Sequence, residues 1–96
     1  MEKIYRINDI ICHNKVSGHH FFSPDTMRFF KSRILDEVYQ GPGGVYFVTS
    51  EKGDDHPRHY TVRSYNPTTG DCRTVGGFNQ LTKARAITGA RKLAQA

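Results

Sequence analysis

Residues 45–94 constrain the fold most, because the spacing of their apolar side chains changes from that of strands to that of a helix. Three runs rich in β-branched and aromatic residues come first: Val45–Ser50, Tyr60–Tyr65 and Cys72–Val75. Each has the length of an ordinary strand, and the gaps between them carry turn residues. Beyond Gly76-Gly77, apolar residues recur at helical spacing at Ala86, Ile87, Ala90, Leu93 and Ala94. This pattern predicts a three-stranded antiparallel meander, followed by a helix that begins near Thr82 and runs to the end.

The first strand is expected to be the central or best-covered one. Val45, Phe47 and Thr49 point to one side of it and the alternate residues to the other, and both sets are partly apolar. In the second strand, Thr61, Arg63 and Tyr65 alternate with a more apolar set, which predicts one solvent-facing side.

Two helices are predicted before the sheet. Ile4, Ile7, Ile10 and Ile11 share one face of a short helix that stops at Gly18, although Asn8 is also a suitable N-cap for a shorter version. A second helix is predicted from Pro24 to Asp36, with Ser23 as its N-cap. Its apolar stripe consists of Met27, Phe30, Ile34 and Val38.

The expected architecture is therefore a single α+β domain over residues 1–96. Residues 1–20 form a helical extension, and residues 21–96 form an α-β-β-β-α core in which helices pack against a three-stranded antiparallel sheet.

The charge balance favours an acidic partner. The formal net charge of +5 at pH 7 favours nucleic acid first, then an anionic membrane surface, then an acidic protein face. No apolar run approaches the length of a membrane span, and Met1-Glu2-Lys3 does not open a signal peptide. Cys12 and Cys72 belong to no CxxC pattern, which is typical of free buried thiols in a reducing compartment. We expect a cytoplasmic protein that makes no membrane contact.

Residues 24–94 resemble the double-stranded RNA-binding domain. Gly53-Asp54-Asp55-His56 stands where that family has its Gly-Pro-x-His loop, with Tyr60 four residues after the histidine. The run Thr82–Ala86, Thr-Lys-Ala-Arg-Ala, looks like the family's Ser-Lys-Lys-x-Ala-Lys helix opening. The resemblance implies helix lysines that contact phosphates across the major groove, and a His loop and first helix that contact minor grooves. Three departures weaken the implied RNA binding more than the implied fold: Asp54 for proline, Ala84 for a lysine and Ile87 for a basic residue.

A second resemblance is to small uncharacterised reading frames of phages and prophages. It is carried by the run Ser23–Arg33, together with Tyr46–Glu51 and Tyr60–Arg63. The resemblance implies an accessory protein of a mobile element, a class that includes inhibitors of host defence and proteins of DNA metabolism.

Basic residues supply the candidate site. The predicted nucleic-acid contacts are Arg28, Lys31, Lys52, His56, Arg58, Lys83, Arg85 and Lys92. Thr61, Arg63 and Tyr65 are a second candidate, as a stacking platform for single strands. The competing interpretation is that the cations form a solvated face over a small core.

The sequence predicts no metal, no cofactor and no catalytic activity. Cys12-His13 and His19-His20 do not give the paired short spacings that are usual for zinc. Asp54-Asp55-His56 lacks a second carboxylate pair, and neither cysteine has a placed base. We therefore expect a small non-catalytic module that engages nucleic acid or a nucleoprotein complex. The alternative is a phage-encoded inhibitor that binds a host protein of defence or DNA metabolism. The oligomeric state is left open.

Overall fold

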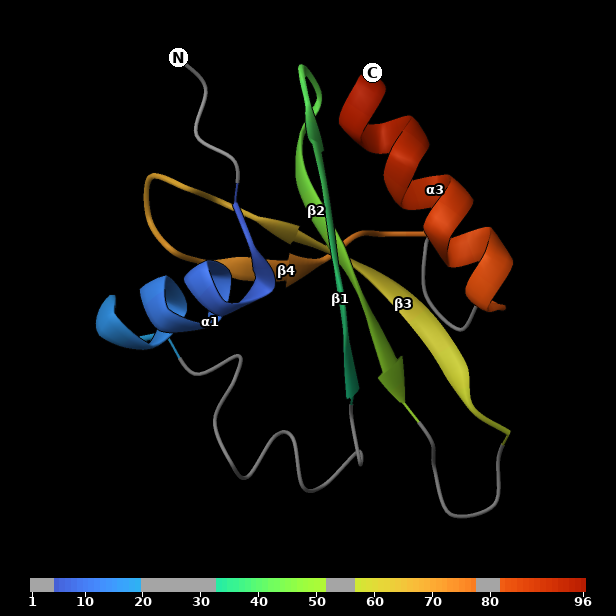
Figure 1. Cartoon of the computed structure of the whole chain (residues 1–96), viewed down its shortest axis with the longest axis horizontal. Helices are drawn as coiled ribbons and strands as arrows, with labels where there is room; N and C mark the ends of the chain where they lie inside the picture. The colour runs from blue at the N-terminus through green and yellow to red at the C-terminus, as the bar shows by residue number, and fades with distance from the viewer. Residues whose placement is uncertain (1–4, 20–32, 52–56, 78–81) are drawn as a thin grey trace.

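A computed structural model of the chain describes residues 5–19, 33–51, 57–77 and 82–96 (Figure 1). The fold is α+β, as predicted, with an antiparallel sheet in the order β1-β2-β3-β4. The elements, in chain order, are α1 (Ile7–Val16), β1 (Arg33–Gly41), β2 (Gly44–Glu51), β3 (His59–Tyr65), β4 (Cys72–Thr74) and α3 (Lys83–Gln95). The three predicted strands are present as β2, β3 and β4, and the sheet has one strand more than expected.

The additional strand, β1, corrects the prediction of a helix that reaches Asp36. Arg33 pairs with Ser50 and Tyr39 pairs with Tyr46, so β1 and β2 form a hairpin, with an irregularity in register between Ile34 and Val38. Ile34 and Val38 are four residues apart, which is the spacing of apolar residues on one face of a helix, and the helix was predicted for that reason. Pairing with β2 satisfies the backbone polar groups along one edge of this segment instead. The first part of the predicted helix, residues 24–32 with Met27 and Phe30, lies outside the described residues.

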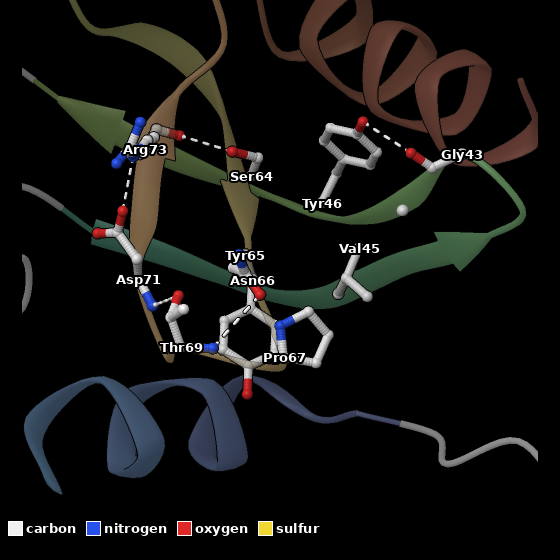
Figure 2. Close-up of a pocket in the computed structure, with 11 residues that line it drawn as sticks. Gly43, Val45, Tyr46, Ser64, Tyr65, Asn66, Pro67, Thr69, Asp71 and Arg73 are labelled. Carbon is white, nitrogen blue, oxygen red and sulfur yellow. Dashed lines mark hydrogen bonds and ion pairs between the residues drawn. The ribbon is translucent and has the colours of Figure 1, made fainter. Parts of the chain in front are cut away.

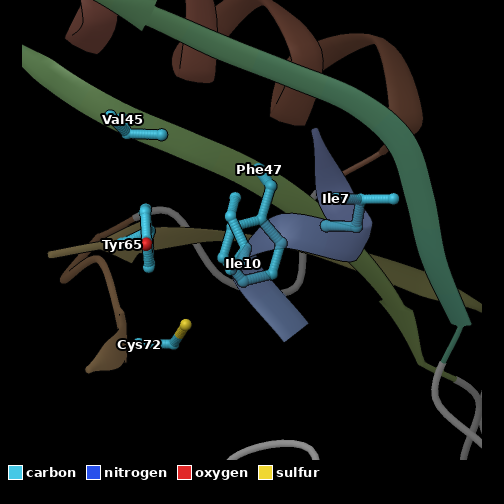
Figure 3. Close-up of a cluster of buried hydrophobic side chains, with 6 residues drawn as sticks. All are labelled: Ile7, Ile10, Val45, Phe47, Tyr65 and Cys72. Atoms are coloured by element: carbon cyan, nitrogen blue, oxygen red, sulfur yellow. The ribbon is translucent and has the colours of Figure 1, made fainter. Parts of the chain in front are cut away.

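The two helices cover opposite faces of the sheet (Figure 1). On the face of α1, one apolar cluster combines helix and strand side chains (Figure 3): Ile7, Ile10, Val45, Phe47, Tyr65 and Cys72. On the face of α3, a second cluster contains Tyr39, Val48, Val62, Ala86, Ala90 and Ala94. Alternate residues of β2 therefore enter different clusters, which confirms that β2 is a central strand covered on both faces.

The β1–β2 turn and the β3–β4 turn are each fastened to one of the helices. At the β1–β2 turn, the backbone N–H of Gly43 donates to the carbonyl oxygen of Ala94 near the end of α3, at 3.0 Å. A Cβ on Gly43 would lie 2.0 Å from the carbonyl oxygen of Leu93, so only glycine allows this approach. At the β3–β4 turn, the side-chain amide of Asn14 in α1 donates to the carbonyl oxygen of Gly70 at 2.8 Å. These bonds fix the positions of the turns that border the cavity described below.

Neither described helix is long and apolar enough to cross a membrane.

Candidate nucleic-acid interface

Four of the eight predicted contact residues lie in the described part of the chain: Arg58, Lys83, Arg85 and Lys92. The other four lie outside it: Arg28, Lys31, Lys52 and His56. Three of these four predicted contacts, Lys83, Arg85 and Lys92, lie on helix α3. The local structure of α3 therefore determines whether they are exposed to solvent.

Helix α3 begins where the sequence predicts. Thr82 is its N-cap, and the Thr82 hydroxyl oxygen accepts a hydrogen bond from the backbone N–H of Arg85 at 3.3 Å. Ala86, Ala90 and Ala94 are buried against the sheet, because residues four apart share one face of a helix. Lys83, Arg85 and Lys92 are exposed.

Arg85 and Lys92 lie on the same side of α3. The two residues are seven apart, which is two turns or roughly 10 Å along the helix axis. A cavity of about 380 Å³ runs between them, and its described lining consists of Ala84, Arg85, Thr88, Gly89 and Lys92. This arrangement places two cations and one hydroxyl along a groove on the surface of the helix.

The first turn of α3 carries basic residues, whereas acidic residues are usually favoured at the start of a helix. It contains Lys83 and Arg85 and no acidic residue. The N-terminus of a helix carries a partial positive charge, so each cation there is unfavourable by about 0.3–1 kcal/mol. The charge arrangement therefore reduces the stability of the helix and strengthens the positive potential at its start.

Two other arginines are held by contacts within the fold. Arg91 Nη2 lies 3.9 Å from Glu37 Oε1, and its guanidinium lies 5.7 Å from the centre of the Tyr39 ring, so Arg91 connects α3 to β1. Arg58 Nη1 donates to the Ser50 hydroxyl at 2.7 Å and is half-buried. Arg58 is thereby directed at the sheet, and it does not lie on α3.

The charge of the chain is uneven along its length. Residues 56–96 contain seven lysines and arginines and a single acidic residue, Asp71, whereas residues 1–55 contain seven lysines and arginines and eight acidic residues. The excess positive charge therefore belongs to the part of the chain that forms β3, β4 and α3.

The predicted stacking platform on β3 is wrong, because Tyr65 packs against α1 and Thr61 is also buried. Tyr65 is 5% exposed and Thr61 is 2% exposed. The Tyr65 ring packs edge-on against Tyr5, with ring centres 5.5 Å apart, and burial raises the pKa of its hydroxyl. Arg63 Nε donates to the Thr49 hydroxyl at 3.0 Å. The expected solvent-facing side of this strand is thus largely buried.

A second cavity, of about 490 Å³, was not predicted from the sequence (Figure 2). It lies between the β1–β2 turn and the β3–β4 turn, and it is bordered by Gly43, Gly44, Val45, Tyr46, Ser64, Tyr65, Asn66, Pro67, Thr69, Asp71 and Arg73. The cavity combines two tyrosines, hydroxyl and amide groups, one arginine and the carboxylate of Asp71.

The charged side of this cavity is an ion pair. Arg73 Nε lies 2.6 Å from Asp71 Oδ2, and His19 Nδ1 lies 3.7 Å from Asp71 Oδ1. The hydrogen bond from Arg73 lowers the pKa of the Asp71 carboxyl, so the carboxylate is charged at neutral pH. The Arg73 side chain remains 81% exposed.

A model of a family of unknown function, DUF7447, matches residues 6–91. The chain belongs to the DUF7447 family. No curated protein and no solved structure matches it. The family match gives no indication of a phage origin or of a double-stranded RNA-binding domain, so both resemblances stay predictions.

The two cysteines of this DUF7447 chain have different environments. Both are free thiols; Cys72 is buried, as expected, whereas Cys12 is exposed. Burial raises the pKa of the Cys72 thiol to about 12, so Cys72 is protonated and unreactive at neutral pH. Within the described ranges, no three histidine, cysteine or acidic side chains are grouped as metal ligands would be.

Proposed function

We propose that this DUF7447 protein is a small non-catalytic module that binds nucleic acid through the phosphate backbone. Exposed cations of α3 are its principal contacts. One observation carries the proposal: Lys83 and Arg85 occupy the first turn of a helix that contains no acidic residue. A charge arrangement that reduces stability is expected where a function requires it.

Phosphate is the anion that this surface suits best. Lysine and arginine side chains along a groove contact successive phosphates and release condensed counterions, which gives affinity without sequence preference. The N-terminus of α3 adds its partial positive charge to that of Lys83 and Arg85. The excess of positive charge over residues 56–96 adds a longer-range attraction to a polyanion.

The setting of this activity is part of the proposal. The resemblance of Ser23–Arg33 and two strand segments to phage reading frames supports a place in the cytoplasm of a phage host. The partner there is nucleic acid, free or within a nucleoprotein complex.

The test compares two double variants that remove the same charge. Arg85→Ala/Lys92→Ala removes cations from the groove on α3, and Arg6→Ala/Lys15→Ala removes exposed cations near α1, which covers the other face of the sheet. Fluorescence anisotropy with a labelled duplex over a salt series measures the slope of log affinity against log salt. The α3 variant should flatten this slope by about 1.4–1.8, because each lost phosphate contact counts for roughly 0.7–0.9.

The α1 variant should leave the slope within experimental error of that of the wild type. An equal decrease of the salt slope in the two variants would show that affinity depends on the net charge of the protein and not on the position of the cations. If the wild-type protein binds neither duplex nor single strand at low salt, the proposed function is wrong. The cations of α3 would then be solubilising residues or contacts to an acidic host protein.

A further inference from the structure

A row of side chains crosses the sheet on the face of α3. Tyr39 pairs with Tyr46, Tyr46 with Ser64, and Ser64 with Arg73. Tyr39 is 7% exposed and lies beneath Arg91, whereas Arg73 is exposed. Helix α3 thus covers the β1 end of this row and leaves its β4 end open. The cavity between the two hairpin turns lies over the open end (Figure 2).

The Tyr46 ring forms a fixed wall of this cavity. Its hydroxyl donates to the carbonyl oxygen of Gly43 at 3.0 Å, and the ring packs against the apolar cluster on the α3 face. Gly43 is held in turn by the hydrogen bond to Ala94. The ring is therefore oriented before any ligand arrives, which reduces the ordering cost of stacking on it.

The β3–β4 turn forms the wall next to Tyr65. The side-chain oxygen of Asn66 accepts hydrogen bonds from the backbone N–H groups of Thr68 and Thr69, at 2.9 and 3.3 Å. This turn is rigid because Asn66 also closes it through its backbone, donating to the carbonyl oxygen of Asp71 at 2.9 Å. The Asn66 side chain offers its amide NH₂ group to a ligand as a donor.

The remaining wall is formed by the Arg73–Asp71 ion pair. The Nε of Arg73 is held by Asp71, and the side chain is mostly exposed, so its terminal nitrogens can meet an anion from solvent. The Asp71 carboxylate also borders the cavity and repels anions, but the Arg73 guanidinium lies against it and offsets its charge.

The Tyr46 ring, the Ser64 hydroxyl and the Arg73 guanidinium follow one another in the same order as the base, the sugar and the phosphate of one nucleotide. Tyr46 and Arg73 are two strand spacings apart, roughly 10 Å, with the Ser64 hydroxyl between them. A base against the Tyr46 ring therefore places its sugar over Ser64 and its phosphate beside Arg73. A base in a duplex is already stacked and paired, so only an unpaired base can enter this cavity.

We propose that this cavity binds one unstacked base of a single-stranded RNA or DNA. The proposal rests on the proposed nucleic-acid binding and gives it a preferred ligand. It assigns stacking to Tyr46 and phosphate contact to Arg73, whereas α3 supplies contacts that do not depend on bases.

The test uses three strands of one length: oligouridylate, oligothymidylate, and an abasic deoxyribose-phosphate strand with the same charges. Wild-type protein should bind the better of the two base-bearing strands at least about fivefold more tightly than the abasic strand, which is the low end for one stacked base. The two base-bearing strands distinguish RNA from DNA as the source of the base. Equal affinity for base-bearing and abasic strands would overturn the proposal.

Two variants locate the effect. Ser64→Leu fills the floor of the cavity and should abolish the preference for bases, so that the base-bearing and abasic strands bind with equal affinity. Arg6→Ala/Lys15→Ala serves as the control and should keep the preference. Because Ser64→Leu can disturb the sheet, Tyr46→Trp provides a second measurement. The chain contains no tryptophan, so this variant has a single indole, and base-bearing strands should quench its fluorescence whereas the abasic strand should not.

The outcomes separate this inference from the proposed function. Quenching that persists in Arg85→Ala/Lys92→Ala, with an unchanged salt slope, supports the cavity and contradicts the role of α3. A normal salt slope without quenching or base preference supports α3 and overturns the cavity. Failure to bind any of the three strands overturns the cavity, and failure to bind duplex as well overturns the proposed function.

Discussion

The hydroxyl of Tyr65 lies 2.5 Å from Nδ1 of His13, which joins the end of strand β3 to helix α1. The two rings also meet edge-on, with centres 5.8 Å apart. This contact, together with the Asn14–Gly70 hydrogen bond, holds α1 on the β3–β4 hairpin. It also removes from the surface the tyrosine that the sequence suggested as a stacking residue.

We expect Tyr65→Phe to lower the free energy of unfolding by about 0.5–1.5 kcal/mol, because one partly buried hydrogen bond is lost. A double-mutant cycle with His13→Ala, measured by urea denaturation, isolates the pair. The coupling energy should fall in the same range. Additive effects of the two substitutions would show that the His13–Tyr65 bond contributes nothing.

Phe47→Ala should be strongly destabilising, by about 3–5 kcal/mol, since this side chain is 0% exposed at the centre of the α1-side cluster (Figure 3). Val16→Ala, at a side chain that is 81% exposed, should change stability by less than about 0.5 kcal/mol. Thermal or urea unfolding measures both variants. Losses of similar size would contradict the assignment of the core.

Gly70 and Gly77 provide a matched test of packing between the hairpin and α1. Both have a positive φ, of 79° and 81°, so alanine at either position carries a left-handed strain of about 1–2 kcal/mol. A Cβ on Gly70 would also lie 2.7 Å from the Ser17 hydroxyl oxygen and 2.9 Å from the His13 carbonyl oxygen, whereas nothing lies within 4 Å of one on Gly77. Gly70→Ala should therefore lower the melting temperature clearly more than Gly77→Ala does. Equal decreases in melting temperature would mean that the hairpin is not closely packed against α1 at Gly70.

Stability should fall as the pH rises above about 9, because of Cys72. The unfolded thiol ionises near its ordinary pKa of 9.0, whereas burial keeps the folded thiol protonated to about 12. Between these values the unfolded state binds fewer protons, so the free energy of unfolding declines with pH at up to about 1.4 kcal/mol per unit.

The test of this pH dependence is urea unfolding between pH 8 and roughly pH 9.5, because Tyr39 and Tyr65, whose pKa values are also raised by burial, add to the decline as unfolded tyrosines ionise near 10.0. Cys72→Ala should flatten the decline, and Cys12→Ala, at the exposed thiol, should not. An unchanged slope in Cys72→Ala would exclude this thiol as the source.

Lys83→Glu should stabilise the protein while weakening its binding to nucleic acid. The change removes an unfavourable cation from the first turn of α3 and adds an anion that complements the helix dipole, so we expect the free energy of unfolding to rise by about 0.6–2 kcal/mol. Lys92→Glu, in the last turn, is the matched control: it should lower stability by a similar amount and also weaken binding. Urea unfolding and duplex anisotropy measure the two effects. Unchanged affinity in both variants would mean that α3 does not contact phosphates.

The local sequence determined most of the strands, the start of α3 and the exposure of its cations. Strand alternation, turn residues and the Thr82 cap act over a few residues. The sequence alone was therefore sufficient to predict β2, β3, β4 and α3. The same is true of Arg85 and Lys92, because helical spacing alone places them opposite Ala86 and Ala90.

Only the tertiary structure decided that residues from Arg33 onwards form β1, that Tyr65 is buried and that a cavity lies beside Tyr46. Each depends on elements far apart in the chain. β1 forms because β2 supplies its hydrogen-bond partners, and Tyr65 is covered by α1, whose His13 lies 52 residues earlier in the chain. Alternation along a strand shows which residues share a face, but it carries no information about what packs on that face.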